Sequence, residues 1–222
     1  LFGVSPAIAI GTDLVYNSVT KFFGALQHFK QRTVNIKLVK WLAYGSIPGA
    51  VTSIGLLKLF DAFFNHQETV MKYALAVMLV LVASVVIFRQ IFERFLKENR
   101  WQKKALEEKK MLMVAAGAVL GFVVGLTSIG SGSMFALVLL YFFRLKAAEI
   151  VGTDVAHAFL LVTVAGLMHA GLGNVNYLLA LNLLAGSIPG VIIGSLASAK
   201  VPAKPLRMFM AGLILISGVM LI

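Results

Sequence analysis

The pentapeptide GSIPG occurs twice in this chain, at 45–49 and again at 186–190. The same offset of 141 positions relates several other stretches without any insertion. Matches at one fixed offset indicate an internal duplication, so we expect the chain to fold as two similar halves. The further matches pair Gly11-Thr12-Asp13 with Gly152-Thr153-Asp154, His28 with His169, and Val34-Asn35 with Val175-Asn176.

The composition is that of a membrane protein. Hydrophobic residues make up 59% of the 222 residues and charged residues 13%, whereas soluble domains carry about 25% charged residues. A helix of about 20 apolar residues crosses the hydrocarbon core of a bilayer, and 70–88 is the clearest such stretch. We expect helical spans at 6–27, 37–58, 70–92, 148–170, 177–198 and 204–222.

The net charge of +11 does not indicate nucleic-acid binding, because Lys and Arg cluster in loops between apolar segments. Such clusters are typical of cytoplasmic loops that face anionic lipid. The chain has no cysteine, which excludes disulfides and thiolate metal sites, and we expect neither a metal nor a cofactor. The first residues do not resemble the charged region and cleavage site of a signal peptide.

Segment 111–143 is too long for one crossing, since a single helix of this length would measure about 50 Å. The run SIGSGS at 128–133 interrupts it and disfavours helix. The positive-inside rule decides between a broken crossing and a hairpin. Segment 89–110 carries eight Lys or Arg, and only a hairpin places the later basic residues on the same, cytoplasmic side. These are Arg144, Lys146, Lys200, Lys204 and Arg207.

The same rule orients the two halves. The basic loop after 6–27 is cytoplasmic, so 6–27 and its counterpart 148–170 cross in opposite directions. The expected fold is an all-α polytopic membrane protein with two inverted-topology repeats and a broken, re-entrant-like helical hairpin. We expect a first repeat at 1–92, a charged cytoplasmic linker at 93–110 and a second repeat at 111–222. Under the offset, the first-repeat counterpart of 111–141 lies outside this sequence.

The interruption in the hairpin is the candidate substrate site. Glycine-rich backbone inside a membrane leaves N–H groups that protein, water or a ligand must satisfy. Together with nearby hydroxyls, these groups form a candidate cradle for an oxyanion, and the alternative is close helix packing through small residues. The predicted substrate-binding residues are Thr127, Ser128, Gly130, Ser131, Gly132 and Ser133.

The two Gly-Thr-Asp motifs place acids inside predicted spans, where an ionisable residue is a functional hypothesis by default. We predict coupling or gating roles for Asp13 and Asp154, with Thr12 and Thr153 beside them. The alternative is an acid near a helix N-terminus, with the threonine helping to cap the helix.

Histidines accompany these acids. His157 follows Asp154 by three residues, so both project from one helical face. His28 and His169 match each other near the far ends of their spans, and all three are candidates for proton coupling. The alternative for the matched pair is interfacial capping or packing. Lys21 lies inside its span and is a candidate to attract an anion, to pair with Asp13 or to snorkel to the interface.

The GSIPG copies place a proline in mid-span, where it frees a carbonyl and favours a kink. We predict that they form a hinge or a cavity wall, and direct substrate contact is the weaker alternative. The residues concerned are Gly45, Ser46, Pro48, Gly186, Ser187 and Pro189.

The order of these motifs along the chain, and the occurrence of several of them in two copies, resemble the TauE/SafE family of sulfite exporters. The resemblance covers nearly the whole chain outside the charged linker and rests on GFVVGLTSIGSGSMFALVLLYFF, AAEIVGTDVAHAF and NVNYLLALNLLAGSIPGVIIGSLAS. It implies a secondary transporter of sulfite, a sulfonate or a related small anion in the bacterial inner membrane, coupled to protons and working by alternating access. The family's pore motif is commonly a run of glycines, and here hydroxyls replace several of them.

Three other functions remain open at this point. An Asp-based carrier of a cation or another small solute would have both acids facing one cavity. An intramembrane aspartyl protease needs Gly-x-Gly-Asp, whereas this chain reads IGTD at 10–13, and we therefore expect no enzyme. A purely structural subunit would not need the broken hairpin. The expected partners are a small anion, the lipid bilayer and protons, with a homodimer left open and no nucleic acid.

Overall fold

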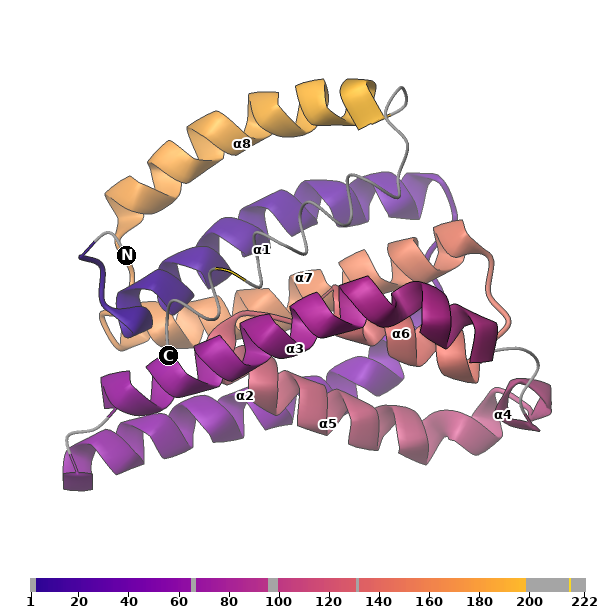
Figure 1. Cartoon of the computed structure of the whole chain (residues 1–222), viewed down its shortest axis with the longest axis horizontal. Coiled ribbons are helices and arrows are strands. Elements are labelled where there is room, and N and C mark those ends of the chain that lie inside the picture. The colour runs from indigo at the N-terminus through magenta and orange to yellow at the C-terminus, as the bar shows by residue number, and fades with distance from the viewer. Residues whose placement is uncertain (1–2, 65–66, 96–99, 131, 199–215, 217–222) are drawn as a thin grey trace.

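The computed structural model describes residues 3–64, 67–95, 100–130, 132–198 and 216. Within the helices, the side chains of 60–67, 85–100, 133, 147 and 189–198 are not described. The expected span at 204–222 therefore lies outside the described residues, except for position 216. Figure 1 shows the long helices lying side by side along the length of the molecule.

Every regular element in the described ranges is helical. In chain order they are α1 (Pro6–Lys30), α2 (Ile36–Phe64), α3 (Gln67–Phe95), α4 (Arg100–Lys103), η1 (Glu107–Lys109), α5 (Lys110–Thr127), α6 (Ser133–Phe142), α7 (Ala147–Gly171) and α8 (Tyr177–Ser198).

Three helices in the described part of the chain are long and apolar enough to cross a membrane. They cover Ile36–Leu59, Glu107–Thr127 and Ala148–Gly171. α1 is a helix of span length, 25 residues, but Asp13, Asn17 and Lys21 lower its hydropathy. Together with the apolar composition, these helices make the chain a multi-pass membrane protein.

α1 and α7 run antiparallel and are tied together at both ends by equivalent hydrogen bonds. Near one end the N–H of Asn176 donates to Thr12 Oγ1 over 3.0 Å, and near the other the N–H of Asn35 donates to Thr153 Oγ1 over 3.0 Å. The two asparagines also cap helices, because Asn35 Oδ1 accepts from Leu38 N and Asn176 Oδ1 accepts from Leu179 N. Each threonine thus accepts a hydrogen bond from the loop that follows the other helix. These bonds account for Thr12 and Thr153 without a capping role in their own helices.

Glycines bring α2 and α5 into backbone contact. A Cβ on Gly45 would collide with the carbonyl of Val114, and one on Gly121 with the backbone of Ser46. Such four-residue spacing of small residues is a common device for close helix packing in membranes. The first GSIPG copy therefore packs on the hairpin helix α5, while α2 continues as helix through Pro48. The glycines on this seam are Gly45, Gly49, Gly117, Gly121 and Gly125.

The second GSIPG copy lies in a different setting. No described atom lies within 4 Å of a Cβ built on Gly186, and Ser187 Oγ donates to Leu184 O within its own helix over 3.3 Å. The side chain of Pro189 is not described. The hinge role predicted for both copies stays a prediction.

α5 and α6 are the two legs of segment 111–143, and their outer ends lie together. Lys109 Nζ donates to Phe142 O over 3.0 Å, and Gln102 Nε2 donates to Leu140 O over 3.3 Å. The start of α5 and the end of α6 therefore lie close together, and the re-entrant course of this segment in a membrane stays a prediction. α5 ends at Thr127, and the residue that follows, Ser128, has a left-handed φ of 58°; Gly130 then has a φ of 98°.

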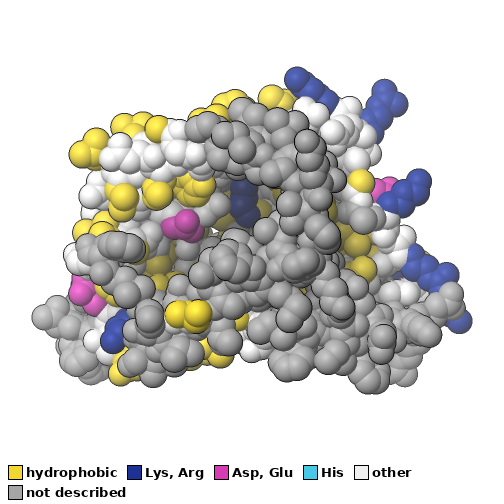
Figure 2. Space-filling model, turned by 45° about the horizontal axis from the view of Figure 1, so that its top comes forward, with side chains coloured by type: hydrophobic (Ala, Val, Ile, Leu, Met, Phe, Trp, Pro, Cys, Tyr) yellow, Lys and Arg dark blue, Asp and Glu magenta, His cyan; other side chains and the backbone are white. Residues whose placement is uncertain are grey.

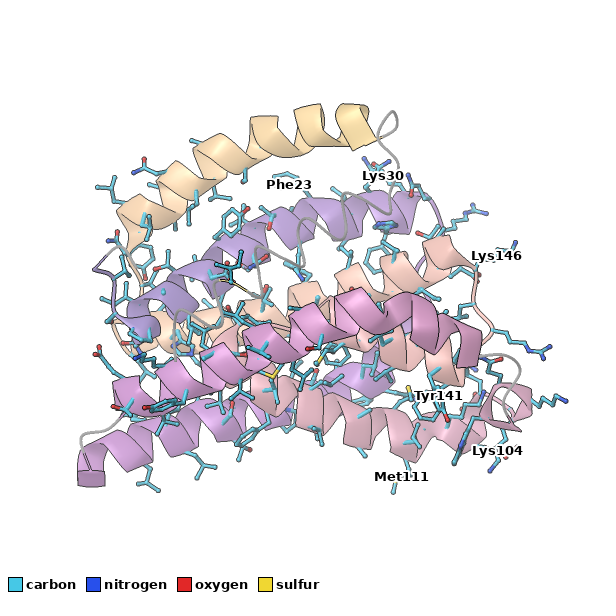
Figure 3. The ribbon with its side chains drawn as sticks, in the orientation of Figure 1. Phe23, Lys30, Lys104, Met111, Tyr141 and Lys146 are labelled. Atoms are coloured by element: carbon cyan, nitrogen blue, oxygen red, sulfur yellow. The ribbon has the colours of Figure 1, made fainter. Side chains whose placement is uncertain are left out.

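Basic side chains gather at one end of the helical array. Lys30 is the last residue of α1, Lys104 lies in the linker after α4, and Lys146 directly precedes α7. All three project from the same end of the molecule in Figure 3. At this end an ion pair of 3.0 Å joins Lys37 Nζ, at the start of α2, to Glu107 Oε1 of the linker, and both side chains are exposed. This distribution is the one that the positive-inside rule associates with a single membrane face.

Candidate functional site

The turn between α5 and α6, residues 128–132, connects two acids that come from different halves of the chain. At one end of the turn the Ser128 hydroxyl donates a hydrogen bond to the Asp13 carboxylate of α1. At the other end, a Cβ built on Gly132 would lie 3.7 Å from Asp154 Oδ2 of α7. We call the residues 128–130 and 132 together with Asp13 and Asp154 the apex site.

Asp13 has its hydrogen bonds satisfied. Asn17 Nδ2, one helical turn further along α1, donates to Asp13 Oδ2 over 2.8 Å, in addition to the bond from Ser128. Asp13 and Asn17 share one helix face because they are four residues apart. This acid is therefore held in place between its own helix and the hairpin.

Asp154 is more deeply buried and less well satisfied. Only 7% of the residue is exposed, and its Oδ1 has no hydrogen-bond partner among the described residues. The repeat offset explains the difference, because the position equivalent to Asn17 is Ala158. At the offset of 141 positions the acid is therefore present twice, but its amide partner only once.

Lys21 supplies the positive charge near the site. It lies two turns after Asp13 on α1 and interacts electrostatically with both Asp154 and Asp13. Its counterpart in the second half is Val162, so the base is present once. Acidic and basic side chains are both visible in the middle of the face shown in Figure 2, away from the basic side chains at the end of the molecule.

His157 joins the site to the first GSIPG motif. Its Nε2 lies 2.7 Å from Ser46 Oγ of α2, its ring packs 4.3 Å from that of Phe135 of α6, and none of the residue is exposed. Its Nδ1 has no partner among the described residues. Ser46 of the first GSIPG copy thus contacts the histidine of α7.

The matched histidines differ in their surroundings. His169 is 1% exposed and its Nε2 lies 3.1 Å from the carbonyl oxygen of Gly125, near the end of α5. His28 Nδ1 lies 2.9 Å from Thr33 Oγ1 in the loop after α1. His169 therefore links α7 to the hairpin, whereas His28 contacts its own loop and is not brought to the apex site.

The predicted substrate residues have several roles in the turn. Thr127 is buried, and its hydroxyl donates to Val123 O over 2.8 Å and accepts from Ile129 N over 3.3 Å, so it stabilises the turn itself. Gly130 has a backbone conformation that suits glycine. Ser131 lies outside the described residues, and of Ser133 only its position at the start of α6 is described.

One residue of the site, Asn17, was not among the candidates from the sequence, whereas Lys21 was named there as a candidate partner of Asp13. Asn17 and Lys21 continue from Asp13 at intervals of four, so α1 carries a polar stripe at 13, 17 and 21. That spacing places three polar residues on one face of an otherwise apolar helix, a signal that the sequence contains. The contact between Ser46 and His157 has no such signal, because it depends on how α2 lies against α7.

Comparison with known proteins gives consistent matches along the whole chain. The sequence model described as "Sulfite exporter TauE/SafE" matches residues 1–221. Three similar proteins of Bacillus subtilis (strain 168) are each described as a probable membrane transporter protein. YjnA is 56% identical over 222 residues, covering 100% of this chain and 87% of the relative.

The other two relatives are more distant. YunE is 28% identical over 99% of this chain and 82% of its own length. YdhB is 24% identical over 93% of this chain and 81% of its own length. No solved structure matches the chain.

Proposed function

The chain belongs to the sulfite exporter TauE/SafE family, and from that premise we propose that it moves a small sulfur-containing anion, such as sulfite or a sulfonate, across the bacterial inner membrane. That it is a membrane transporter of the TauE/SafE type follows from the family and from relatives described as transporters. The names of family and relatives fit a protein that is not an enzyme.

The observation that carries the proposal is the irregular turn at the apex site. A turn within apolar helices needs partners for its backbone groups, and such turns are tolerated where they line a cavity or bind a ligand. Here the turn meets Asp13 and Asp154, and Lys21 interacts electrostatically with both acids; ionisable residues of this kind are rare in membrane helices. An anion in the apex site would contact the hydroxyls and N–H groups of residues 128–133 and the ammonium group of Lys21.

We propose alternating access between two inverted repeats as the mechanism. The antiparallel course of α1 and α7 and their equivalent threonine–asparagine bonds support this reading. The basic end of the molecule faces the cytoplasm in this proposal, and the hairpin α5–α6 enters and leaves the membrane on that side. Protons are the proposed coupling ion, because ionisable groups at the apex site can take up and release them.

A second candidate function is an Asp-based carrier of a cation or neutral solute. It is favoured by one specific observation, which is that both acids lie at the same turn. A carrier of anions would keep unprotonated acids away from its substrate. The two functions differ in which solute crosses the membrane, so a transport assay separates them.

The test uses uptake of radiolabelled sulfite into proteoliposomes that contain the purified protein, with an imposed pH gradient. Gly132→Leu would project a side chain toward Asp154, because a Cβ built on Gly132 lies 3.7 Å from Asp154 Oδ2. Gly55→Leu is the matched control, because a Cβ on Gly55 has no described atom within 4 Å.

We expect Gly132→Leu to abolish sulfite uptake and Gly55→Leu to leave it unchanged. Uptake that survives Gly132→Leu would contradict the apex site. Transport of a cation or neutral solute by wild-type protein that moves no sulfite, sulfonate or carboxylate would establish the second function instead.

A further inference from the structure

Three buried side-chain atoms in the described residues have no hydrogen-bond partner, and all three are on α7. They are Asp154 Oδ1, His157 Nδ1 and His169 Nδ1. The first two residues are three positions apart and therefore project from one helix face. His169 lies about three turns further along α7, beside the end of α5. Asp154 and His157 thus present two unused polar atoms to the same part of the molecule.

Burial of Asp154 Oδ1 without a hydrogen bond costs free energy when the carboxylate is charged. A buried carboxylate oxygen without a hydrogen bond loses its hydration and receives nothing in return. Binding a proton there would remove the buried charge and create an O–H donor. Asp13 has no such need, because Asn17 and Ser128 both donate to it.

Ser46 Oγ and His157 Nε2 share a hydrogen bond whose direction depends on the tautomer of the histidine. A serine hydroxyl that donates to Nε2 leaves the proton of a neutral imidazole on Nδ1. The unpaired Nδ1 is then a donor. Phe135 packs against the ring and holds it in this orientation.

The charges around Asp154 favour the protonated form when an anion is present. Among the described residues, the charged group that interacts with Asp154 is Lys21 of α1, which also interacts with Asp13. His157 is neutral in the tautomer just described. Ser46 of α2, Phe135 of α6 and Gly132 of the turn carry no charge. With both acids ionised these groups have one negative charge in excess and repel an anion, and one proton on Asp154 removes that excess.

We propose that Asp154 takes up on Oδ1 the proton that travels with the anion, and that this O–H and the Nδ1–H of His157 then both donate hydrogen bonds to it. Ser46 acts as a positioning residue through the histidine tautomer. The proposal rests on the proposed function, deepens it by assigning the proton to one of the two acids, and explains how an anion binds beside acids. Because proton and anion cross in the same direction, a pH gradient drives the anion from the more acidic compartment to the less acidic one.

The decisive variant is Asp154→Asn, tested with methanesulfonate and with sulfite in proteoliposomes. Methanesulfonate stays a monoanion across the pH range of the assay, so its own titration does not enter the result. Asparagine is neutral at every pH and keeps an N–H donor where the proposed O–H would be. The variant should therefore bind and exchange the anion without carrying a proton.

In Asp154→Asn we expect the exchange of external labelled anion for internal unlabelled anion to stay within about threefold of the wild-type rate. Accumulation of the anion driven by a pH gradient should fall by at least about tenfold. Glu149→Gln is the matched control, since Glu149 is an acid on the same helix that only bonds the N–H of Lys146. This control should exchange and accumulate as wild type does.

Accumulation by Asp154→Asn at the wild-type level would overturn the assignment, and so would loss of exchange in a monodisperse preparation. A wild-type measurement tests the proposal if the variant does not fold. Internal pH-sensitive dye should report one proton entering with each methanesulfonate, and methanesulfonate entry without protons would overturn it. If wild type moves neither anion, the proposed function fails, and that outcome is distinct from failure of the Asp154 assignment.

Ser46→Ala tests the positioning role separately. It removes the hydroxyl beside Nε2 without adding volume to the tight seam with Gly121. We expect the KM for the anion to rise by about tenfold, the order of one hydrogen bond to a charged group, with proton coupling retained. An unchanged KM would contradict the role of Ser46.

Discussion

At the scale of residues, Gly11 and Gly152 show how little room there is between the two halves of the chain. A Cβ on Gly11 would collide with the carbonyl of Asn174, and a Cβ on Gly152 would lie 2.6 Å from Thr33 Oγ1. Each glycine precedes the threonine that bonds the opposite loop. The Gly-Thr pair therefore joins the halves, while the acid that follows serves the apex site.

Gly152→Ala tests this close approach. We expect it to destabilise the protein by about 1–3 kcal/mol, because the added methyl meets backbone and cannot be accommodated by a side-chain rotation. Gly55→Ala is the control and should be neutral or stabilising by about 0.5–1 kcal/mol, since its surroundings are open. The measurement is the thermal midpoint of aggregation in detergent, and equal midpoints for the two variants would contradict the account.

Lys21→Met tests the charge balance at the apex site. Removing the base leaves Asp13 and Asp154 without a positive neighbour on α1, so we expect a lower thermal midpoint and loss of sulfite uptake. The double variant Lys21→Met with Asp13→Asn removes one charge of each sign and should recover stability. A double variant less stable than Lys21→Met alone would show that Lys21 does not balance these acids.

At the scale of elements, the hairpin α5–α6 is held closed by a lysine. Lys109 is 2% exposed, its Nζ donates to Phe142 O over 3.0 Å, and it lies 4.6 Å from the centre of the Phe143 ring. The bond satisfies a carbonyl at the end of α6, where helices leave carbonyls without partners. The two legs of the hairpin are thereby fixed at the basic end of the molecule.

We expect Lys109→Met to destabilise the hairpin by about 1–3 kcal/mol, the usual cost of removing a hydrogen bond to a charged group. Lys110→Met is the control, because the neighbouring Lys110 is exposed. Hydrogen exchange of the α6 amides in detergent is the measurement. Equal protection in both variants would mean that Lys109 does not close the hairpin.

Much of this arrangement of elements is predictable from the sequence, and the reason is physical. Apolar length predicts the helices at 36–64 and 147–171 to within a few residues at most ends, because a bilayer requires it. The side of the basic loops predicts that segment 111–143 turns back, and this re-entrant course stays a prediction. The contact of Ser46 with His157 is not predictable in this way, since it depends on the α2–α5 seam and the position of α7 beside it.

At the scale of the whole molecule, the basic end should face the cytoplasm. The absence of cysteine from the sequence makes single-cysteine labelling possible without a background. We expect a membrane-impermeant maleimide to label Tyr177→Cys on intact cells and Lys104→Cys only after permeabilisation. Both positions are exposed: Tyr177 is the first residue of α8, and Lys104 follows α4 in the linker. The reverse labelling pattern would contradict the orientation.

The central claim is that a small sulfur-containing anion and a proton cross together through the apex site. The most direct measurement is uptake of radiolabelled sulfite by wild-type proteoliposomes with an acidic exterior, with and without a protonophore. The account predicts accumulation that the protonophore abolishes and that Gly132→Leu never shows. Sulfite uptake indifferent to the protonophore, or none from any sulfur-containing anion, would contradict it.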